Sequence, residues 1–161
     1  MCGIFGIITK NAIDDSDLKI LAKHAEQRGK DSSGLYYYKN GFYTMHRATH
    51  SVSKLLKNTS YSNSNFIMGH SRLITNGLAD NQPVYRDSAC VIHNGIVVNH
   101  ESIWKTISST PRQEIDTEII AAIAGSTAKF ANAAQDVASA VLKLCEGVVA
   151  CAIALPKLGK L

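Results

Sequence analysis

The chain has 161 residues, of which 45% are hydrophobic and 19% charged, as expected for a soluble globular domain with a sizeable core. Its formal net charge is +4, but Lys and Arg are scattered, which excludes a basic stripe for nucleic acid and a polybasic membrane segment. No window is apolar enough to span a membrane, and the cysteines at positions 2, 90, 145 and 151 contain no CxxC pair, so we expect a cytoplasmic protein.

Hydrophobic periodicity and turn residues predict the elements of the first half of the chain. We expect strands at 4–9, 36–38, 42–44 and 66–70, a helix from Asp15 or Ser16 that stops at Gly29, and a short helix from Ser51 to Leu56. The Asn40-Gly41 pair between two β-rich runs predicts a hairpin. The three consecutive tyrosines at 36–38 should then face alternate sides of a sheet.

The second half is richer in helices. We expect strands at 90–93 and 148–155, a helix opened by Asn99 or His100, a helix capped by Asp116 and Thr117 and stopped by Gly125, and a helix over 132–144 ending at Gly147. The turn at 156–160 predicts a return strand from about Leu161, which indicates a fragment or the front end of a longer protein. Because strands and helices fall in blocks, the pattern favours a layered sandwich with mainly antiparallel sheets.

The N-terminus carries a candidate nucleophile. Removal of Met1 would leave Cys2 with both a thiol and an α-amino group. These groups have ordinary pKa values near 8.5 and 8, so the amine can take the proton from the sulfur of its own residue. The alternative is that Cys2 is a small apolar residue that opens a strand.

Two later clusters could bind a polar substrate. Arg72 and Thr75 follow an apolar strand, and an arginine fork beside a hydroxyl suits a carboxylate; a surface strand end is the alternative. The Asn94 side chain and the Gly95 N–H could aim two donors at one point, as an oxyanion hole requires; an Asn-Gly turn is the alternative.

Charged residues at two helix boundaries complete the candidates. Arg28 and Asp31 flank the expected helix stop at Gly29, ahead of Gly34, and a helix stop followed by a turn is the simpler interpretation. Asp116 at a helix start is typical of a cap, but it could also hold an ammonium group. His46 and His50 lack the glutamate of a metalloprotease helix, and no phosphate or dinucleotide loop occurs, so we expect neither a metal nor a cofactor.

A thiol, an amide donor pair, an arginine and an aspartate together suit an amino acid with an acyl side chain. Six motifs carry a resemblance in chain order: MCGIFGI, RGKDSSG, GHSRLITNG, DNQPV, HNGIVVNHE and EIDTEIIAAI. In this order they resemble the glutaminase domain of class II glutamine amidotransferases. The last two are most similar to glucosamine-6-phosphate synthases.

The resemblance implies an α+β fold: a four-layer αββα sandwich of the N-terminal-nucleophile hydrolases, with 1–161 forming one amidotransferase domain that is incomplete at its C-terminus. It implies that Cys2 attacks the side-chain amide of L-glutamine, with Asn94 and Gly95 as oxyanion donors. Arg72 and Thr75 would hold the α-carboxylate and Asp116 the α-ammonium group. Arg28 and Asp31 would support the site.

The resemblance leaves the ammonia acceptor open. A sugar phosphate is the main expectation, with the acceptor domain in the same longer chain or on a partner chain. The alternatives are the amidotransferase half of an asparagine synthetase-like or phosphoribosylamine-forming enzyme, a free-standing amidase, and a non-catalytic binding module. Leu73 and Asn76 stand where glucosamine-forming members typically have Trp and His, so coupling of site closure to sugar binding is in doubt.

Overall fold

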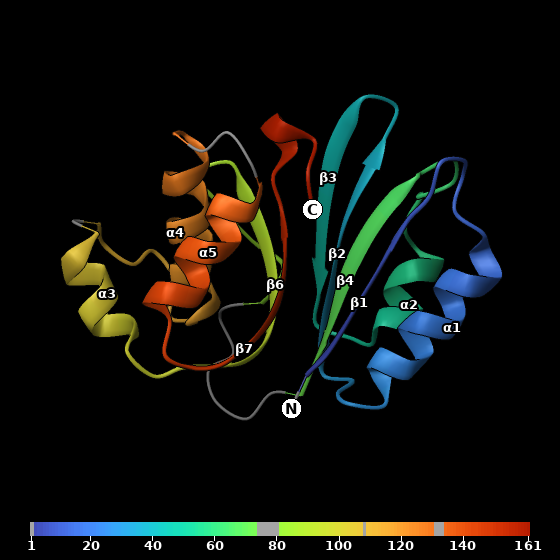
Figure 1. Cartoon of the computed structure of the whole chain (residues 1–161). Coiled ribbons are helices and arrows are strands. Elements are labelled where there is room, and N and C mark those ends of the chain that lie inside the picture. The colour runs from blue at the N-terminus through green and yellow to red at the C-terminus, as the bar shows by residue number, and fades with distance from the viewer. Residues whose placement is uncertain (1, 74–80, 108, 131–133) are drawn as a thin grey trace. The chain divides into compact units, whose positions relative to one another are not determined.

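The computed structural model describes residues 2–73, 81–107, 109–130 and 134–161. The chain forms two compact units, Met1–Pro83 and Val84–Leu161 (Figure 1). Each unit has an antiparallel sheet with helices on one of its faces. None of the helices in the described ranges is long and apolar enough to cross a membrane.

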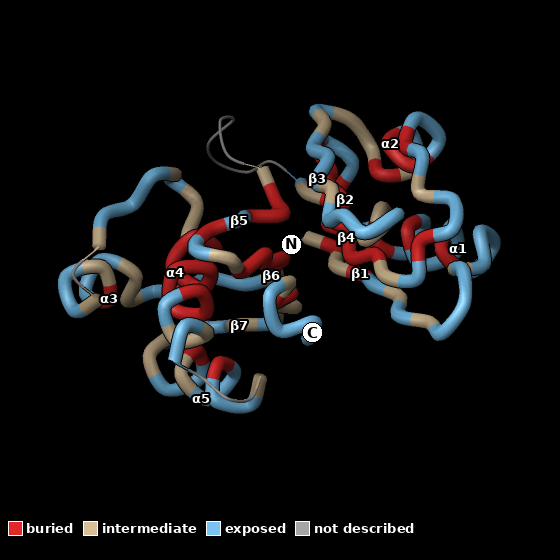
Figure 2. Tube along the Cα trace, turned by 90° about the horizontal axis from the view of Figure 1, so that it is seen from above, coloured by how far each residue is buried: buried red, intermediate tan, exposed pale blue. Residues whose placement is uncertain are grey.

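The first unit contains a sheet with the strand order β1-β4-β2-β3 and two helices. Its elements are β1 (Gly3–Ile8), α1 (Asp15–Glu26), β2 (Ser32–Lys39), β3 (Phe42–Ala48), α2 (Val52–Lys57) and β4 (Phe66–Arg72). Leu18 and Ala22 of α1 and Leu55 of α2 pack against Leu35 and Ile67 of the sheet. The core of this unit therefore lies between the helices and the sheet face that they cover (Figures 1 and 2).

The predicted hairpin is confirmed. Asn40 and Gly41 connect β2 to β3, and both have the positive φ angles that a tight two-residue hairpin turn requires, 52° and 87°. Tyr37 belongs to the core under the helices, whereas Tyr36 and Tyr38 both contact the Tyr43 ring. The three tyrosines thus alternate between the two faces, as expected.

The second unit contains a sheet with the strand order β5-β6-β7. Its elements are β5 (Val84–Arg86), β6 (Ala89–Val97), α3 (His100–Thr106), α4 (Thr117–Ala128), α5 (Ala134–Leu144), β7 (Gly147–Ala154) and the 3-10 helix η1 (Pro156–Leu158). Residues 117–125 of α4 are all buried (Figure 2), because α4 contacts β5 and β6 as well as α3 and α5. Apart from Thr117 and Glu118, these buried residues are apolar or glycine, as expected for a helix in a core.

Several expected boundaries were wrong. Asp14 caps α1 through its carboxylate, not Asp15 or Ser16. Helix α4 continues through Gly125, where a Cβ would lie 2.6 Å from the Asp87 carbonyl oxygen; this glycine permits close packing and does not stop the helix. Gly147 begins β7 instead of ending α5. The start of α5 predicted at residue 132 lies outside the described residues.

The turn after β7 is confirmed in its local form. Pro156 begins η1, Gly159 adopts the left-handed conformation with φ 58°, and Leu155 and Lys160 form an antiparallel bridge. Leu155 N–H donates to the Lys160 carbonyl over 2.8 Å, and the Lys160 N–H donates back over 3.3 Å. The chain direction therefore reverses within these six residues.

Candidate active site

Cys2 lies immediately before β1, at one end of the first sheet. In the antiparallel ladder between β1 and β4, Gly3 lies opposite Ser71, so Cys2 and Arg72 occupy the same end of adjacent strands. Gly3 also packs tightly on the end of α1, since a Cβ there would lie 2.2 Å from the Ala25 carbonyl oxygen. The start of β1 is thereby fixed against α1, while Cys2 itself stays partly exposed.

Arg28 contacts Cys2 directly. Its Nε donates a hydrogen bond to the Cys2 carbonyl oxygen over 3.1 Å. Arg28 follows the last turn of α1, where its N–H still bonds the Ala25 carbonyl at 3.0 Å. The guanidinium thus connects the end of α1 to the residue that carries the candidate thiol.

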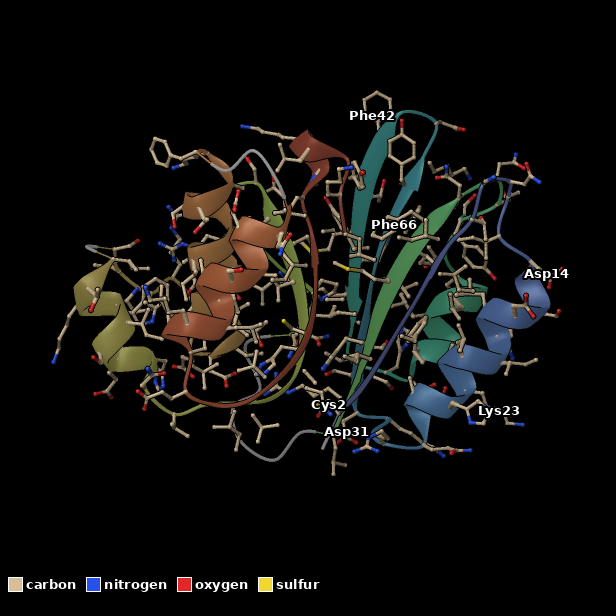
Figure 3. All side chains as sticks on the ribbon, in the orientation of Figure 1. Cys2, Asp14, Lys23, Asp31, Phe42 and Phe66 are labelled. Atoms are coloured by element: carbon tan, nitrogen blue, oxygen red, sulfur yellow. The ribbon has the colours of Figure 1, made fainter. Side chains whose placement is uncertain are left out.

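The segment after Arg28 lies against the end of β4. Asp31 N–H donates to the Arg72 carbonyl at 3.0 Å, and the Ser71 hydroxyl donates to the Gly29 carbonyl at 2.6 Å. A Cβ on Gly29 would lie 2.2 Å from the Leu73 nitrogen, so only glycine permits this approach. Figure 3 shows Cys2 and Asp31 at the same end of the sheet. Thr75 lies outside the described residues.

This arrangement corrects the interpretation of residues 28–34 as a helix stop followed by a turn. Only residues up to Asp31 form the connection, because β2 begins at Ser32 and is already paired with Arg72 of β4. The pairing places the Asp31 backbone beside Arg72. Four of the predicted residues, Cys2, Arg28, Asp31 and Arg72, therefore come together in the first unit.

Asn94 and Gly95 lie within β6 of the second unit, not beyond its end as the sequence suggested. They pair with Ala150 and Val149 of β7 in a continuous ladder. A Cβ on Gly95 would lie 1.8 Å from the Val148 carbonyl oxygen, so the backbone here approaches β7 too closely for any other residue. Asn94 is half-buried and Gly95 exposed, which leaves this part of β6 accessible from solvent.

Asp116 directly precedes α4 but does not cap it with its side chain. Its Oδ2 accepts a hydrogen bond from the Val97 N–H of β6 at 2.8 Å. Its side chain is 25% exposed. The carboxylate therefore lies at the end of β6, against Val97, which follows Gly95 by two residues, and it remains reachable by a cationic group.

His93 is a buried neighbour of this group that sequence reasoning left among the core and surface histidines. Its Nε2 lies 3.2 Å from the Val148 carbonyl oxygen, and its Nδ1 lies 3.5 Å from the Thr117 hydroxyl and 3.9 Å from Asp116 Oδ1. It thus links β7 to the start of α4. The signal available in the sequence was its position directly before the Asn-Gly pair.

The other thiols are poor candidates for the nucleophile. Cys90 is fully buried. Burial, followed by the Cys151 thiol and the Asp116 charge, raises the pKa of Cys145 to about 11. Burial also raises the pKa of Cys151. Because the thiolate is the reactive form, Cys145 and Cys151 are suppressed as nucleophiles at neutral pH.

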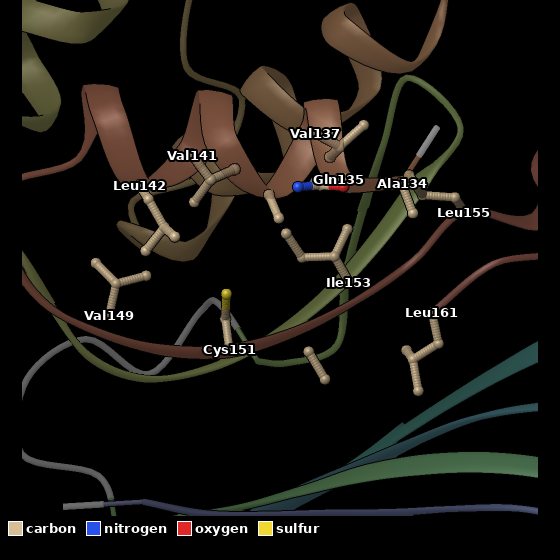
Figure 4. A pocket seen from close by; sticks show the side chains of 12 residues that line it. Ala134, Gln135, Val137, Val141, Leu142, Val149, Cys151, Ile153, Leu155 and Leu161 are labelled. Atoms are coloured by element: carbon tan, nitrogen blue, oxygen red, sulfur yellow. The ribbon is translucent and has the colours of Figure 1, made fainter. Parts of the chain in front are cut away.

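An apolar pocket of about 530 Å³ lies between α5 and β7 (Figure 4). Leu142, Val149 and Ile153 contribute to its walls, and the described residues that line it include no charged side chain. A zwitterionic amino acid needs partners for both of its charges. This pocket is therefore not a site for glutamine.

No protein-family model matches the chain. It is 35% identical over 131 residues to a glutamine–fructose-6-phosphate aminotransferase (isomerizing) of Bartonella henselae, covering 75% of this chain and 21% of that protein. A protein of the same name from Agrobacterium fabrum is 30% identical over 152 residues, covering 89% of this chain and 24% of that protein. The chain thus spans about a fifth to a quarter of the length of these relatives.

Solved structures also share the fold of this chain. The glutamine phosphoribosylpyrophosphate amidotransferase from B. subtilis, complexed with ADP and GMP, matches with a TM-score of 0.74 and 22% identity, covering 96% of this chain and 35% of that one. A structure described as the allosteric regulatory enzyme of purine biosynthesis matches with the same TM-score over 95% of this chain and 35% of that one. The relatives and structures confirm the resemblance and the fold class that the six motifs predicted.

Proposed function

We propose that this chain, a class II glutamine amidotransferase domain with the N-terminal-nucleophile hydrolase fold, hydrolyses the side-chain amide of L-glutamine to glutamate and ammonia. The observation that carries the proposal is the placement of Cys2, immediately before β1 and beside the end of β4 that bears Arg72. The Cys2 carbonyl oxygen also accepts a hydrogen bond from Arg28. A nucleophile and an arginine that can bind a carboxylate, both at the same end of a sheet, suit an amino acid substrate.

The reaction begins once Met1 has been removed. The Cys2 α-amino group takes the thiol proton, and the thiolate attacks the amide carbon of glutamine. The Asn94 side-chain amide and the Gly95 N–H stabilise the tetrahedral oxyanion, each such donor contributing about 3 kcal/mol. As the C–N bond breaks, the ammonium form of the α-amine returns its proton to the leaving nitrogen. Water then attacks the thioester and releases glutamate.

Charged and polar side chains orient the substrate. Arg72 and Thr75 hold the glutamine α-carboxylate, and Asp116 holds the α-ammonium group. Support comes from the Asp116 carboxylate, which makes no cap on α4 and keeps a quarter of its side chain exposed. Arg28 and Asp31 support the site, Arg28 through the Cys2 carbonyl and Asp31 through the Arg72 carbonyl.

We further propose a sugar phosphate as the ammonia acceptor, with fructose 6-phosphate converted to glucosamine 6-phosphate by an acceptor domain on the same longer chain or on a partner. Support comes from the names of the sequence relatives, which are aminotransferases of glutamine and fructose 6-phosphate. The structural likeness to a phosphoribosylpyrophosphate amidotransferase favours phosphoribosylamine formation as the second candidate. The cysteine pattern favours a cytoplasmic location.

Glutamate release from glutamine tests the catalytic proposal. The wild-type chain should release glutamate, Cys2→Ala should release none, and Cys145→Ala should keep the wild-type rate. A variant with one residue retained before Cys2 should also be inactive, because its α-amine no longer belongs to the nucleophile. Full activity in Cys2→Ala would refute the assignment, and activity with the extra residue would remove the α-amine as base.

The acceptor needs a separate observation. Sugar-isomerase domains encoded downstream of residue 161, or on a chain that co-purifies with this one, would support the fructose 6-phosphate proposal. A phosphoribosyltransferase domain would favour the second candidate, and an ATP-pyrophosphatase motif would contradict both.

A further inference from the structure

A buried ion pair joins β5 to α4 in the second unit. Arg86 Nη1 donates to Glu118 Oε1 over 2.5 Å, and the two side chains are only 3% and 2% exposed. Burying two charges costs several kcal/mol per ion unless further hydrogen bonds satisfy the remaining donors and acceptors. The partners of this pair therefore show what it does.

Both charges bind the segment that leads into α4. Glu118 Oε2 accepts from the backbone N–H groups of Arg112 and Gln113 at 2.8 and 2.9 Å. Arg86 Nη2 donates to the Ser109 hydroxyl at 2.7 Å. The ion pair thus holds residues 109–113, of which 110–112 are exposed, through three hydrogen bonds.

A residue of α3 also helps to hold Arg86 in place. The Arg86 guanidinium lies 4.9 Å from the ring centroid of Trp104, a distance at which the ring face attracts a cation. Glu118 also acts through its backbone, since its N–H donates to the Ile115 carbonyl at 3.0 Å. Residues 112, 113 and 115 are consequently all bonded to Glu118, and the next residue in the chain is Asp116.

Asp116 is the residue that this arrangement places. Its carboxylate does not bond its own helix and instead accepts from Val97 at the end of β6. The position of that carboxylate therefore depends on where the chain enters α4. The entry point is set by Glu118 and, through it, by Arg86.

We infer that Arg86 and Glu118 are positioning residues for the recognition of the substrate α-ammonium group, acting through Asp116. The inference rests on the proposed binding of glutamine. A displacement of about 1 Å in a group that orients substrate can lower the rate about 100-fold. Fixing the point at which the chain enters α4 therefore affects catalysis. Arg86 lies outside the six motifs, whereas Glu118 lies within EIDTEIIAAI.

Amide hydrogen exchange tests the positioning step without reference to activity. In Glu118→Gln and Arg86→Gln, exchange at Val97 should rise by about tenfold, because its acceptor is Asp116. The adjacent Val98 amide is a matched control, since it donates to the Glu146 carbonyl at 2.9 Å. Equal exchange changes at Val97 and Val98, or no change at Val97, would overturn the inference.

Arg86→Gln leaves the buried Glu118 carboxylate without its cationic partner and can prevent folding. The double variant Arg86→Leu/Glu118→Met removes both charges and keeps apolar volume, so it serves as the second variant. It should fold, and the increase in amide exchange over the wild type should still be larger at Val97 than at Val98. Wild-type exchange at Val97 in this variant would overturn the inference.

Substrate discrimination tests the ammonium step. The probe is glutaramate, which is glutamine without the α-amino group. The ratio of kcat/KM for glutamine to that for glutaramate should fall about tenfold in Glu118→Gln and in the double variant. It should stay unchanged in Glu26→Gln, whose carboxylate accepts from the Ser53 N–H in the first unit.

The outcomes separate this inference from the proposed function. A wild-type chain that releases no glutamate refutes the proposed function, whereas the Val97 exchange result still decides whether the ion pair positions Asp116. An active wild type with an unchanged ratio in the variants overturns the inference alone.

Discussion

The Arg28 guanidinium donates its Nε hydrogen to the carbonyl oxygen of Cys2, 3.1 Å away. The bond joins residues 26 positions apart and uses neither the thiol nor the α-amine of Cys2. It therefore restrains the residue at the point where restraint does not compete with the proposed chemistry. Gly3 packs closely against the Ala25 backbone and so restrains the other side of the Cys2–Gly3 peptide.

Arg28→Gln should slow glutamate release by about 10- to 100-fold, because a nucleophile held less tightly spends less time in attack geometry. Stability should change by less than about 1 kcal/mol, since Arg28 is exposed and hydrogen bonds of exposed side chains contribute little net free energy. Single-turnover kinetics with saturating glutamine measures the effect. Lys30→Gln removes an exposed charge two residues away and should leave the rate unchanged; equal losses in both variants would exclude a specific role for Arg28.

Gly95→Ala should damage both folding and activity. The added methyl group would lie 1.8 Å from the Val148 carbonyl oxygen, so β6 and β7 would have to separate where they carry the proposed oxyanion donor. We expect a loss of about 3 kcal/mol or more in urea denaturation. Gly159→Asn is the control, because Gly159 has nothing within 4 Å of a Cβ and asparagine tolerates its left-handed conformation. A fully stable Gly95→Ala protein would contradict the close approach.

The glycines show why the fold could be predicted better than its boundaries. Gly41 was correctly assigned to a hairpin, because the need for positive φ in a two-residue turn is a local property. Gly95 was expected beyond the end of a strand, and Gly125 and Gly147 at helix ends, whereas they lie within β6, within α4 and at the start of β7. Their roles depend on backbone contacts with distant residues, which a local pattern does not contain.

The candidate site divides in the same way. The ordered motifs predict Cys2, Arg72 and Asp116 as site residues, because each motif keeps its residue types together in the sequence. The ion pair of Arg86 and Glu118 joins residues 32 positions apart, and nothing in either neighbourhood indicates the partner. Short β5, which carries Arg86, was also missed, since three residues give no periodicity.

Asp116→Asn should weaken glutamine binding more than it slows the chemical step. The variant keeps a side-chain oxygen for the Val97 N–H but loses the charge that pairs with the substrate ammonium group. We expect KM to rise about 10- to 100-fold while kcat changes by less than about threefold. Initial-rate kinetics separates the two constants. Asp136→Asn, an exposed change in the first turn of α5, should leave both constants as in the wild type; a fall in kcat alone for Asp116→Asn would oppose ammonium binding.

Cys145 should make the fold sensitive to alkaline pH. Burial chiefly raises its pKa from 9.0 to about 11, so between these values the unfolded chain releases the thiol proton while the folded chain retains it. The unfolded state is then favoured as pH rises, and the stability that the neutral thiol contributes is complete below pH 9 and lost through pH 11. In Cys145→Ala the urea midpoint should therefore fall less steeply over this range than in the wild type. Tyr61, whose pKa burial raises to about 12, adds a loss of the same sign at higher pH in both proteins, so parallel curves from pH 9 to 11 would show that Cys145 does not contribute.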